Sequence, residues 1–160
     1  AAVETIVAGA GVPGALQPVR AGLTAAPSAA EKLLADGWFE KATGAVVDWF
    51  KLVGRGDYQA FVAVATDLVP LAGDRNQAQA LLDLLALIWR DALLLGNRVG
   101  DLHFAQWQGD LTPVAQRWRQ DQLLAASELT LECRRLLEQN VNFQTVAEQL
   151  TLRQLAIINQ

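Results

Sequence analysis

The segment from Leu81 to Leu95 constrains the fold more than any other part of the chain. It is interrupted only by Asp83, Arg90 and Asp91, and every other position holds leucine, isoleucine, alanine or tryptophan. A helix that is apolar on nearly all sides does not lie on the surface of a small domain, so it must be surrounded by other helices or covered by another subunit. The three charges argue against a membrane-spanning helix, which needs about 20 apolar residues.

The rest of the chain also favours helices. Apolar residues recur every three or four positions along most of residues 37–160, and no segment alternates apolar and polar residues for long. Gly56 can end one helix, Asp74 can cap the central one, and Asn142 can cap the last. The sequence therefore predicts an all-α fold, a helical bundle of five to six main helices preceded by short helices in residues 1–36.

One helix is expected to be long, from Pro113 to Gln139. Thr112 precedes its proline, and a capping residue followed by proline is typical of a helix start. Arg134 and Glu138 are four residues apart, a spacing that suits an ion pair on the outer face. Trp118 stands between two arginines. We expect its ring to lie in the core or at an interface, with the arginines at the rim.

Composition excludes several kinds of site. The 160 residues include one histidine, His103, and one cysteine, Cys133, so they cannot supply a multi-histidine metal site, and a nucleophile–histidine relay would have no histidine but His103. We expect His103 to be a loop or packing residue and Cys133 to be a small buried apolar group. Thirteen basic and 17 acidic residues give a net charge of -4, so a basic surface over the whole domain is absent. We therefore expect no metal, no cofactor and no catalytic activity in this chain.

Two further motifs resemble parts of known binding sites, one for dinucleotides and one for metal ions. The segment from Gly9 to Gly14 matches the GxGxxG pattern of dinucleotide-binding folds, but Pro18 interrupts the helix that should follow it, and no sheet is predicted. Glu128 and Glu132 are four residues apart on a predicted helix, but they lack the histidine that accompanies such carboxylates in helical metal sites. We interpret the first as a glycine-rich link and the second as a solvated helix face.

The start of the chain bears on its origin. It begins at Ala1 and contains no methionine, so we expect a fragment of a longer protein. No basic segment precedes an apolar core, as it would in a signal peptide. We expect a soluble, cytoplasmic protein.

Three stretches stand out together and in order: Leu23–Leu33, Leu81–Leu94 and Asn140–Leu150. They resemble the delta-prime family of bacterial DNA polymerase III clamp-loader subunits. Leu23–Leu33 is similar to the turn that opens the last helix of the family's AAA+ lid. Leu81–Leu94 is similar to its leucine-rich helix with an Arg-Asp pair, and Asn140–Leu150 to its asparagine-containing turn and last helix. The resemblance implies that residues 1–36 end the AAA+ lid domain and that residues 37–160 form the helical collar domain, which serves oligomerisation.

The same resemblance implies a role in DNA replication. Collar domains from five subunits pack into a ring that holds the loader together. The partners would be the other clamp-loader subunits, with DNA reached only indirectly through the assembled complex and no contact with a membrane. Ser28 or Ala29 stands where an active subunit has its nucleotide-sensing arginine, and Lys32 could not make the same bidentate phosphate contact. The chain would thus be a structural part of the loader, without turnover of its own.

The contacts with neighbouring subunits are expected on the two longest predicted helices. Large obligate interfaces resemble a domain core cut in half, so apolar residues of these helices are the candidates. The expected interface residues are Leu84, Leu87, Ile88, Trp89, Leu94, Trp118, Leu129 and Leu136. A second hypothesis fits the same composition: an all-α adaptor that binds one partner helix in a groove.

Overall fold

A computed structural model of the chain describes residues 37–97 and 102–159. All regular structure within these two ranges is helical, and they contain no strand. This confirms the prediction of an all-α bundle. The predicted lid segment 1–36, the boundary after it and the Gly9–Gly14 motif lie outside the described residues.

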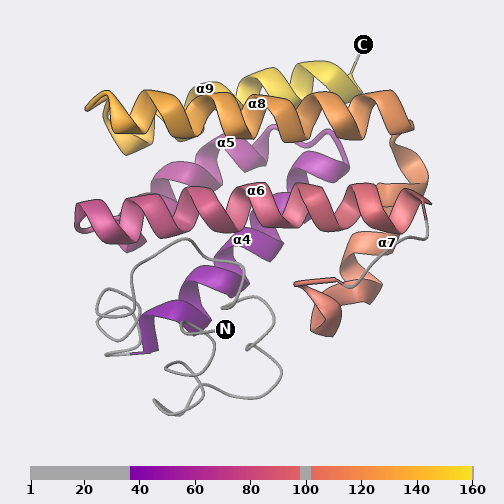
Figure 1. The fold of residues 1–160 in the computed structure, drawn as a ribbon, viewed down its shortest axis with the longest axis horizontal. Coiled ribbons are helices and arrows are strands. Elements are labelled where there is room, and N and C mark those ends of the chain that lie inside the picture. The colour runs from indigo at the N-terminus through magenta and orange to yellow at the C-terminus, as the bar shows by residue number, and fades with distance from the viewer. Residues whose placement is uncertain (1–36, 98–101, 160) are drawn as a thin grey trace.

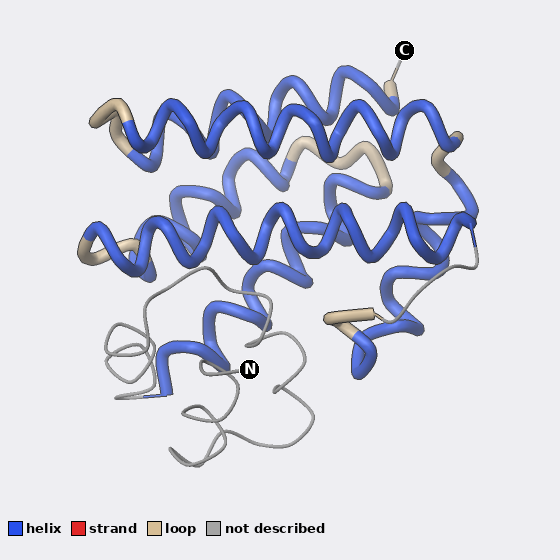
Figure 2. The backbone as a smooth tube through the Cα atoms, in the orientation of Figure 1, coloured by secondary structure: helices blue, strands red, loops and turns tan. Residues whose placement is uncertain are grey.

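The helices follow one another with short connections (Figure 2). In chain order the elements are α4 (Trp38–Gly54), α5 (Gln59–Ala63), the π-helical turn η3 (Val64–Leu68), the 3-10 turn η4 (Val69–Leu71), α6 (Arg75–Asn97), the 3-10 turn η5 (Ala105–Trp107), α7 (Gln108–Arg117), α8 (Gln120–Glu138) and α9 (Phe143–Ile158). The helical segment from Gln59 to Leu71 is thus divided between three helical forms.

Helix α6 lies at the centre of this arrangement (Figure 1). It packs against α4, α7 and α8, and α9 packs on α8. The buried face of α6 is correspondingly wide, and its apolar members are Ala78, Ala80, Leu81, Leu82, Leu84, Leu85, Ile88, Trp89 and Ala92. The prediction that this apolar helix is surrounded by others is confirmed. None of the helices in the described part of the chain is long and apolar enough to cross a membrane.

The antiparallel packing of α6 and α8 follows from contacts at both ends. Near the start of α6, Asp83 pairs with Arg134 near the end of α8. Near the end of α6, Gly96 lies close to Gln120 at the start of α8. Figure 1 shows the two helices side by side along most of their length.

An aromatic cluster joins α6 to α4 and to the end of α7. The ring of Trp89 lies 4.8 Å from that of Phe50, 4.9 Å from that of Trp118 and 6.4 Å from that of Trp49, measured between centroids. Two of these pairs are edge-to-face, the arrangement that aromatic quadrupoles favour. Trp89 therefore ties α4 and the end of α7 to the central helix.

The predicted helix ends are largely as expected. Gly56 has a φ of 71°, the left-handed conformation that glycine adopts at little cost after a helix. The Asp74 carboxylate accepts from the backbone N–H of Gln77 at 2.8 Å, while the Gln77 side chain accepts from the N–H of Gly73. Asn142 caps α9 by accepting from the N–H of Thr145 at 3.3 Å.

The prediction of one helix from Pro113 to Gln139 is wrong. The chain leaves the helical conformation at Trp118, where ψ is 140°, and α8 starts afresh at Gln120. The Trp118 indole N–H donates to the carbonyl of Gly54 at 3.1 Å, and its ring packs on Trp89. These long-range contacts direct the Trp118 side chain into the core. They outweigh the local preference for a continuous helix, so the helix breaks at this residue.

The start of α7 also differs from the prediction. The helix begins at Gln108, five residues before Pro113, so the proline lies inside it. Because proline has no N–H, it cannot donate to the carbonyl of Gly109. Thr112 does not cap the helix, and its hydroxyl donates instead to the carbonyl of Gln108 at 2.7 Å.

Two glycines of α4 should respond oppositely to replacement by alanine. A Cβ at Gly54 would lie 2.3 Å from Cγ2 of Val114, whereas one at Gly44 would meet nothing within 4 Å. We expect Gly54→Ala to lower the free energy of unfolding by about 1 to 3 kcal/mol through overpacking. Gly44→Ala should raise it by about 0.5 to 1 kcal/mol, because alanine restricts the unfolded chain. Urea denaturation of both variants measures this, and equal effects would contradict the described packing of α4 on α7.

Candidate protein-interaction surface

Half of the predicted interface residues belong to the chain's own core. Leu84, Ile88, Trp89 and Trp118 are between 0% and 3% exposed. A side chain enclosed by its own fold offers no surface to a partner while that fold is intact. These four apolar side chains form part of the hydrophobic core of the bundle.

The other four predicted residues are half-buried. Leu87 and Leu94 lie on α6, and Leu129 and Leu136 lie on α8. Leu87, Leu129 and Leu136 pack against the edge of the core. Their part in an interface stays a prediction.

A hollow of about 200 Å³ lies between α6 and α8. Its apolar lining comes from Ala86 and Leu87 on α6 and from Leu131 on α8. Its polar lining comes from Asp83, Arg90, Ser127 and Arg134. The hollow has room for a single aliphatic side chain of a partner, rather than for an extended ligand.

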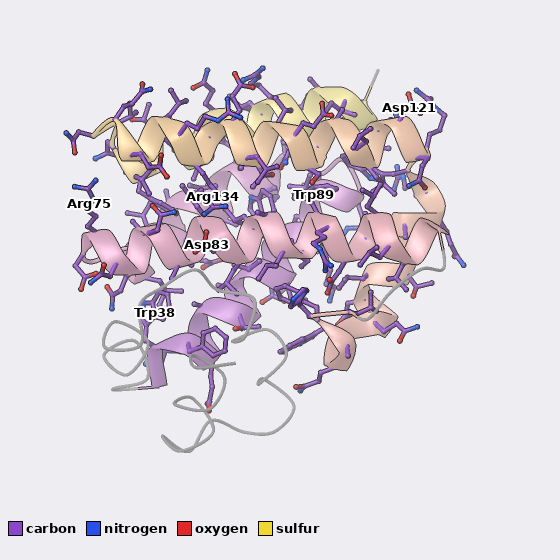
Figure 3. The ribbon with its side chains drawn as sticks, viewed as in Figure 1. Trp38, Arg75, Asp83, Trp89, Asp121 and Arg134 are labelled. Carbon is purple, nitrogen blue, oxygen red and sulfur yellow. The ribbon has the colours of Figure 1, made fainter. Side chains whose placement is uncertain are left out.

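Two residues that line this hollow, Asp83 and Arg134, form an ion pair between α6 and α8 (Figure 3). Arg134 reaches Asp83 with Nη2 2.8 Å from Oδ1. The aspartate side chain is 3% exposed and the arginine side chain 24% exposed, so water screens the pair little. The sequence instead predicted that Arg134 would pair along its own helix with Glu138.

The outer face of α8 exposes two large leucines. Leu124 is 48% exposed and Leu131 is 46% exposed. They are seven residues apart and therefore lie on the same side of the helix, about 10 Å apart. Neither leucine was among the candidates chosen from the sequence, because those on this helix, Leu129 and Leu136, lie on another side of it and are half-buried.

Arg90 and Asp91, the Arg-Asp pair of α6, hold the segment around Phe104 that follows the helix. The Asp91 side chain is completely buried, and its Oδ2 accepts from the backbone N–H of Phe104. Its Oδ1 lies 3.5 Å from Nδ1 of His103 and 3.7 Å from Nη1 of Arg90. Arg90 Nη1 lies 2.9 Å from His103 Nδ1, so in that contact the imidazole nitrogen is the acceptor. His103 is thus a packing residue within a polar cluster.

Burial raises the pKa of the Asp91 carboxyl above its ordinary value. Hydrogen bonds from the backbone of Phe104 and His103, together with the nearby imidazole, oppose this effect but do not cancel it. A raised pKa in a cleft can indicate catalysis. Here the carboxyl is enclosed and holds the backbone of Phe104, so the shift reflects a structural role.

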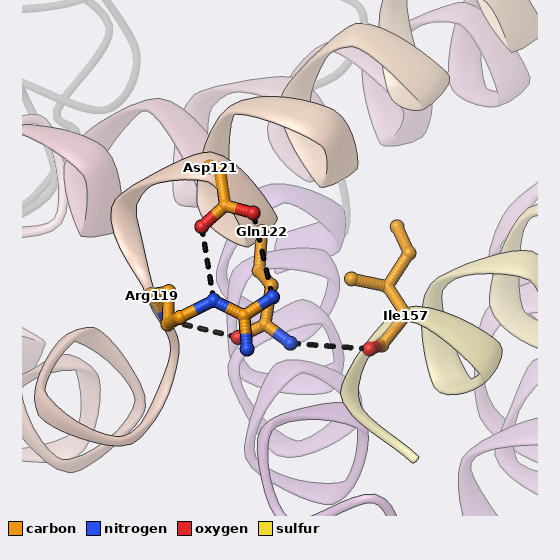
Figure 4. Close-up of polar contacts among 4 residues, drawn as sticks. All are labelled: Arg119, Asp121, Gln122 and Ile157. Carbon is orange, nitrogen blue, oxygen red and sulfur yellow. Dashed lines mark hydrogen bonds and ion pairs between the residues drawn. The ribbon is translucent and has the colours of Figure 1, made fainter. Parts of the chain in front are cut away.

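The start of α8 is fixed by contacts with the end of α9 (Figure 4). The side chain of Gln122 accepts from the backbone N–H of Arg119 at 2.9 Å and donates to the carbonyl of Ile157 at 3.2 Å. The guanidinium of Arg119 lies 3.1 Å from Asp121, which lowers the pKa of that carboxyl. Arg119 therefore lies at the rim, as predicted, and its charge is already paired.

The remaining candidate residues stay apart from one another. Glu128 and Glu132 are exposed, as expected of a solvated face, and Glu132 approaches Arg153 at 3.9 Å. Cys133 is 1% exposed and packs in the core, as predicted. Within residues 37–97 and 102–159 there is no group of three histidine, cysteine or acidic side chains placed to hold a metal ion.

Comparison with known protein families, with curated proteins and with solved structures finds no match to this chain.

Replacement of Asp91 by asparagine should change how stability depends on pH. Asparagine can still accept from Phe104 but carries no buried charge. An ordinary aspartate has a pKa of about 3.9, and in the folded chain the pKa is higher. The folded state therefore holds a proton that the unfolded state has lost, so this contribution to stability is present at low pH and declines as pH rises through the folded pKa. We expect Asp91→Asn to gain stability relative to the parent chain as pH is raised from about 4 to 7.

Asp121 provides the opposite case for the same experiment. Its pKa is lowered by Arg119, so its contribution is lost as pH falls. Urea denaturation should show Asp91→Asn gaining stability relative to the parent chain as pH rises from about 4 to 7, and Asp121→Asn gaining it as pH falls below about 4. If the difference in the free energy of unfolding between Asp91→Asn and the parent chain does not change with pH, burial does not disfavour the charged form of Asp91, and this account is contradicted.

Arg134 should be costly to remove by itself. Arg134→Leu leaves Asp83 buried without its arginine, which we expect to lower the free energy of unfolding by about 3 kcal/mol. Adding Asp83→Leu should recover most of this loss, because the double variant buries no charge. Urea denaturation of the single and double variants tests this. Additive losses would contradict a direct coupling of the two residues.

Proposed function

We propose that the chain is a non-catalytic assembly module, the lid end and collar domain of a subunit of a bacterial DNA-replication clamp loader. Its partners are the other loader subunits, and DNA is contacted only through the assembled complex. The work of the module is to hold subunits together, while nucleotide binding and turnover belong to other parts of the loader. Such a loader works in the cytoplasm.

One observation carries this proposal. The stretch Leu81–Leu94, with the Arg-Asp pair that resembles the delta-prime family, forms the middle of the central helix of an all-helical bundle. Within this stretch, Asp91 accepts a hydrogen bond from the backbone N–H of Phe104, so the aspartate of the pair has a structural role. A second resembling stretch, Asn140–Leu150, supplies the turn and the cap of α9.

The surface supports an assembly role as well. Leu124 and Leu131 on α8, Leu152 on α9, and Tyr58 and Val62 near α5 are large apolar residues left exposed. Exposed apolar side chains at several places on one small domain suit a protein with more than one neighbour. They offer no constellation for chemistry.

An adaptor that binds a single partner helix is the second candidate. The observation that favours it is the hollow between α6 and α8, where Ala86, Leu87 and Leu131 could receive one side chain of an amphipathic helix. An adaptor needs only that helix, whereas a collar domain needs the folded domains of its neighbours.

The two candidates are separated by size-exclusion chromatography with light scattering. The chain is mixed with the collar domains of the loader subunits of its own organism, and in parallel with single helix peptides taken from those domains. We expect a stable complex of defined mass with the folded domains and none with the peptides. The matched control is the same subunits without their collar domains, which should not co-elute with the chain.

No complex with any collar domain, at concentrations well above micromolar, would contradict the loader role. Binding of one helix peptide as tightly as the folded domain from which it comes would favour the adaptor.

A further inference from the structure

One oxygen of the buried Asp91 carboxylate has no hydrogen-bond partner. The side chain is completely buried, and its Oδ2 accepts from the backbone N–H of Phe104. Its Oδ1 is enclosed and accepts no hydrogen bond. A buried polar atom without a partner costs free energy, so a donor that reaches Oδ1 would stabilise the fold.

The imidazole of His103 is the side chain placed to become that donor. Its Nδ1 lies 3.5 Å from Oδ1 of Asp91 and 2.9 Å from Nη1 of Arg90. A guanidinium only donates, so Nδ1 is the acceptor in the contact with Arg90 and carries no proton. The imidazole is therefore neutral in this arrangement, with its proton on Nε2.

Uptake of one proton at Nδ1 would reverse both contacts. The nitrogen could no longer accept from Arg90, and the imidazolium and the guanidinium would repel each other. The new Nδ1–H could donate to Oδ1 of Asp91 once the gap closes from 3.5 Å to about 2.8 Å, the usual length of a charge-assisted hydrogen bond. The His103 side chain is 24% exposed, so water can deliver the proton, and the Arg90 side chain is 48% exposed, so its guanidinium can turn into solvent.

Other charged side chains on the elements that pack around α6 have partners of their own. The recorded pairs are Lys51 with Asp110, Arg55 with Asp57, Asp83 with Arg134, and Arg119 with Asp121. Among the described residues, Arg90 and Asp91 are the charged side chains in contact with the imidazole. The balance between these two therefore decides which of them the imidazole binds.

The carboxyl and the imidazole also influence each other's protonation. Burial raises the pKa of the Asp91 carboxyl, and the neighbouring imidazole opposes that rise. The two groups thus titrate as a coupled pair.

We propose that Arg90, Asp91 and His103 form a proton-operated switch, in which the imidazole binds Arg90 when it is neutral and Asp91 when it is protonated. Histidine is the side chain that ordinarily changes charge near neutral pH, so a fall in pH operates the switch. In the protonated state Asp91 holds the segment at His103 and Phe104 through both of its oxygens. Arg90, which also lines the hollow between α6 and α8, then loses its imidazole partner. This inference does not rest on the proposed function, because it concerns the chain by itself.

Nitrogen-15 NMR of the imidazole measures the switch. His103 is the one histidine among the 160 residues, so its ring signals need no further assignment. At high pH, Nδ1 should be unprotonated and Nε2 protonated. As pH falls, both nitrogens should become protonated, and an Nδ1–H signal protected from exchange with water should appear. Circular dichroism at each pH confirms that the helices are intact.

Two substitutions should move the midpoint of this transition in opposite directions. Asp91→Asn removes the negative partner of the protonated state, so the midpoint should fall by about one pH unit, a tenfold loss of proton affinity. Arg90→Gln removes the positive neighbour, so the midpoint should rise. Because Arg90 is largely exposed, this variant tests the switch without disturbing the core. The matched control is Asp110→Asn on α7, whose carboxylate lies 3.6 Å from Lys51, and it should leave the midpoint unchanged.

A proton on Nδ1 at high pH would overturn the proposal, because Arg90 could not then donate to that nitrogen. An imidazole that stays neutral while the Asp91 carboxyl takes up the proton would also overturn it. The same holds if Asp91→Asn and Arg90→Gln move the midpoint no more than Asp110→Asn does, or both in one direction, since the two charges would then not compete for the imidazole.

Discussion

The enclosure of α6 is the constraint on which the rest of the structure depends. Its leucines cover too much of the helix circumference to be buried by one neighbour, so helices must pack on several sides. Trp89 shows how this is achieved, since its ring contacts aromatic side chains from α4 and from the end of α7. The positions of α4, α7 and α8 follow from the need to cover this helix.

Local sequence signals predicted the helix ends that depend on local chemistry. Gly56 ends α4, and Asp74 and Asn142 cap the helices that follow them, because each effect involves a few neighbouring residues. The break at Trp118 could not be read in this way. It is produced by a hydrogen bond to Gly54, 64 residues earlier, and by packing on Trp89.

The same distinction applies to the surface. Apolar periodicity identified the buried side of α8 but gave no sign that Leu124 and Leu131 would remain exposed. Spacing within the helix suggested a pair between Arg134 and Glu138, whereas the antiparallel register of α6 and α8 brings Arg134 to Asp83 instead. Ion pairs between helices and exposed helix faces depend on which helices pack against each other, and the spacing of residues within one helix does not reveal this.

The described residues form a stable scaffold with polar anchors and apolar surface. Asp91 and Asp83, which interrupt the apolar helix in the sequence, each hold a neighbouring segment in the fold. Polar residues inside the bundle thus serve architecture, and the apolar residues that remain outside are available for partners. This division of roles is the physical basis of the assembly function that we propose.

The central claim is that this chain works by burying apolar surface against other subunits. Calorimetric titration of the chain with the collar domains of its neighbours, repeated at several temperatures, tests it most directly. The assembly role requires saturable binding whose enthalpy becomes more negative as temperature rises, the mark of apolar surface removed from water. An absence of binding heat at every temperature, or binding with no change in heat capacity, would contradict it.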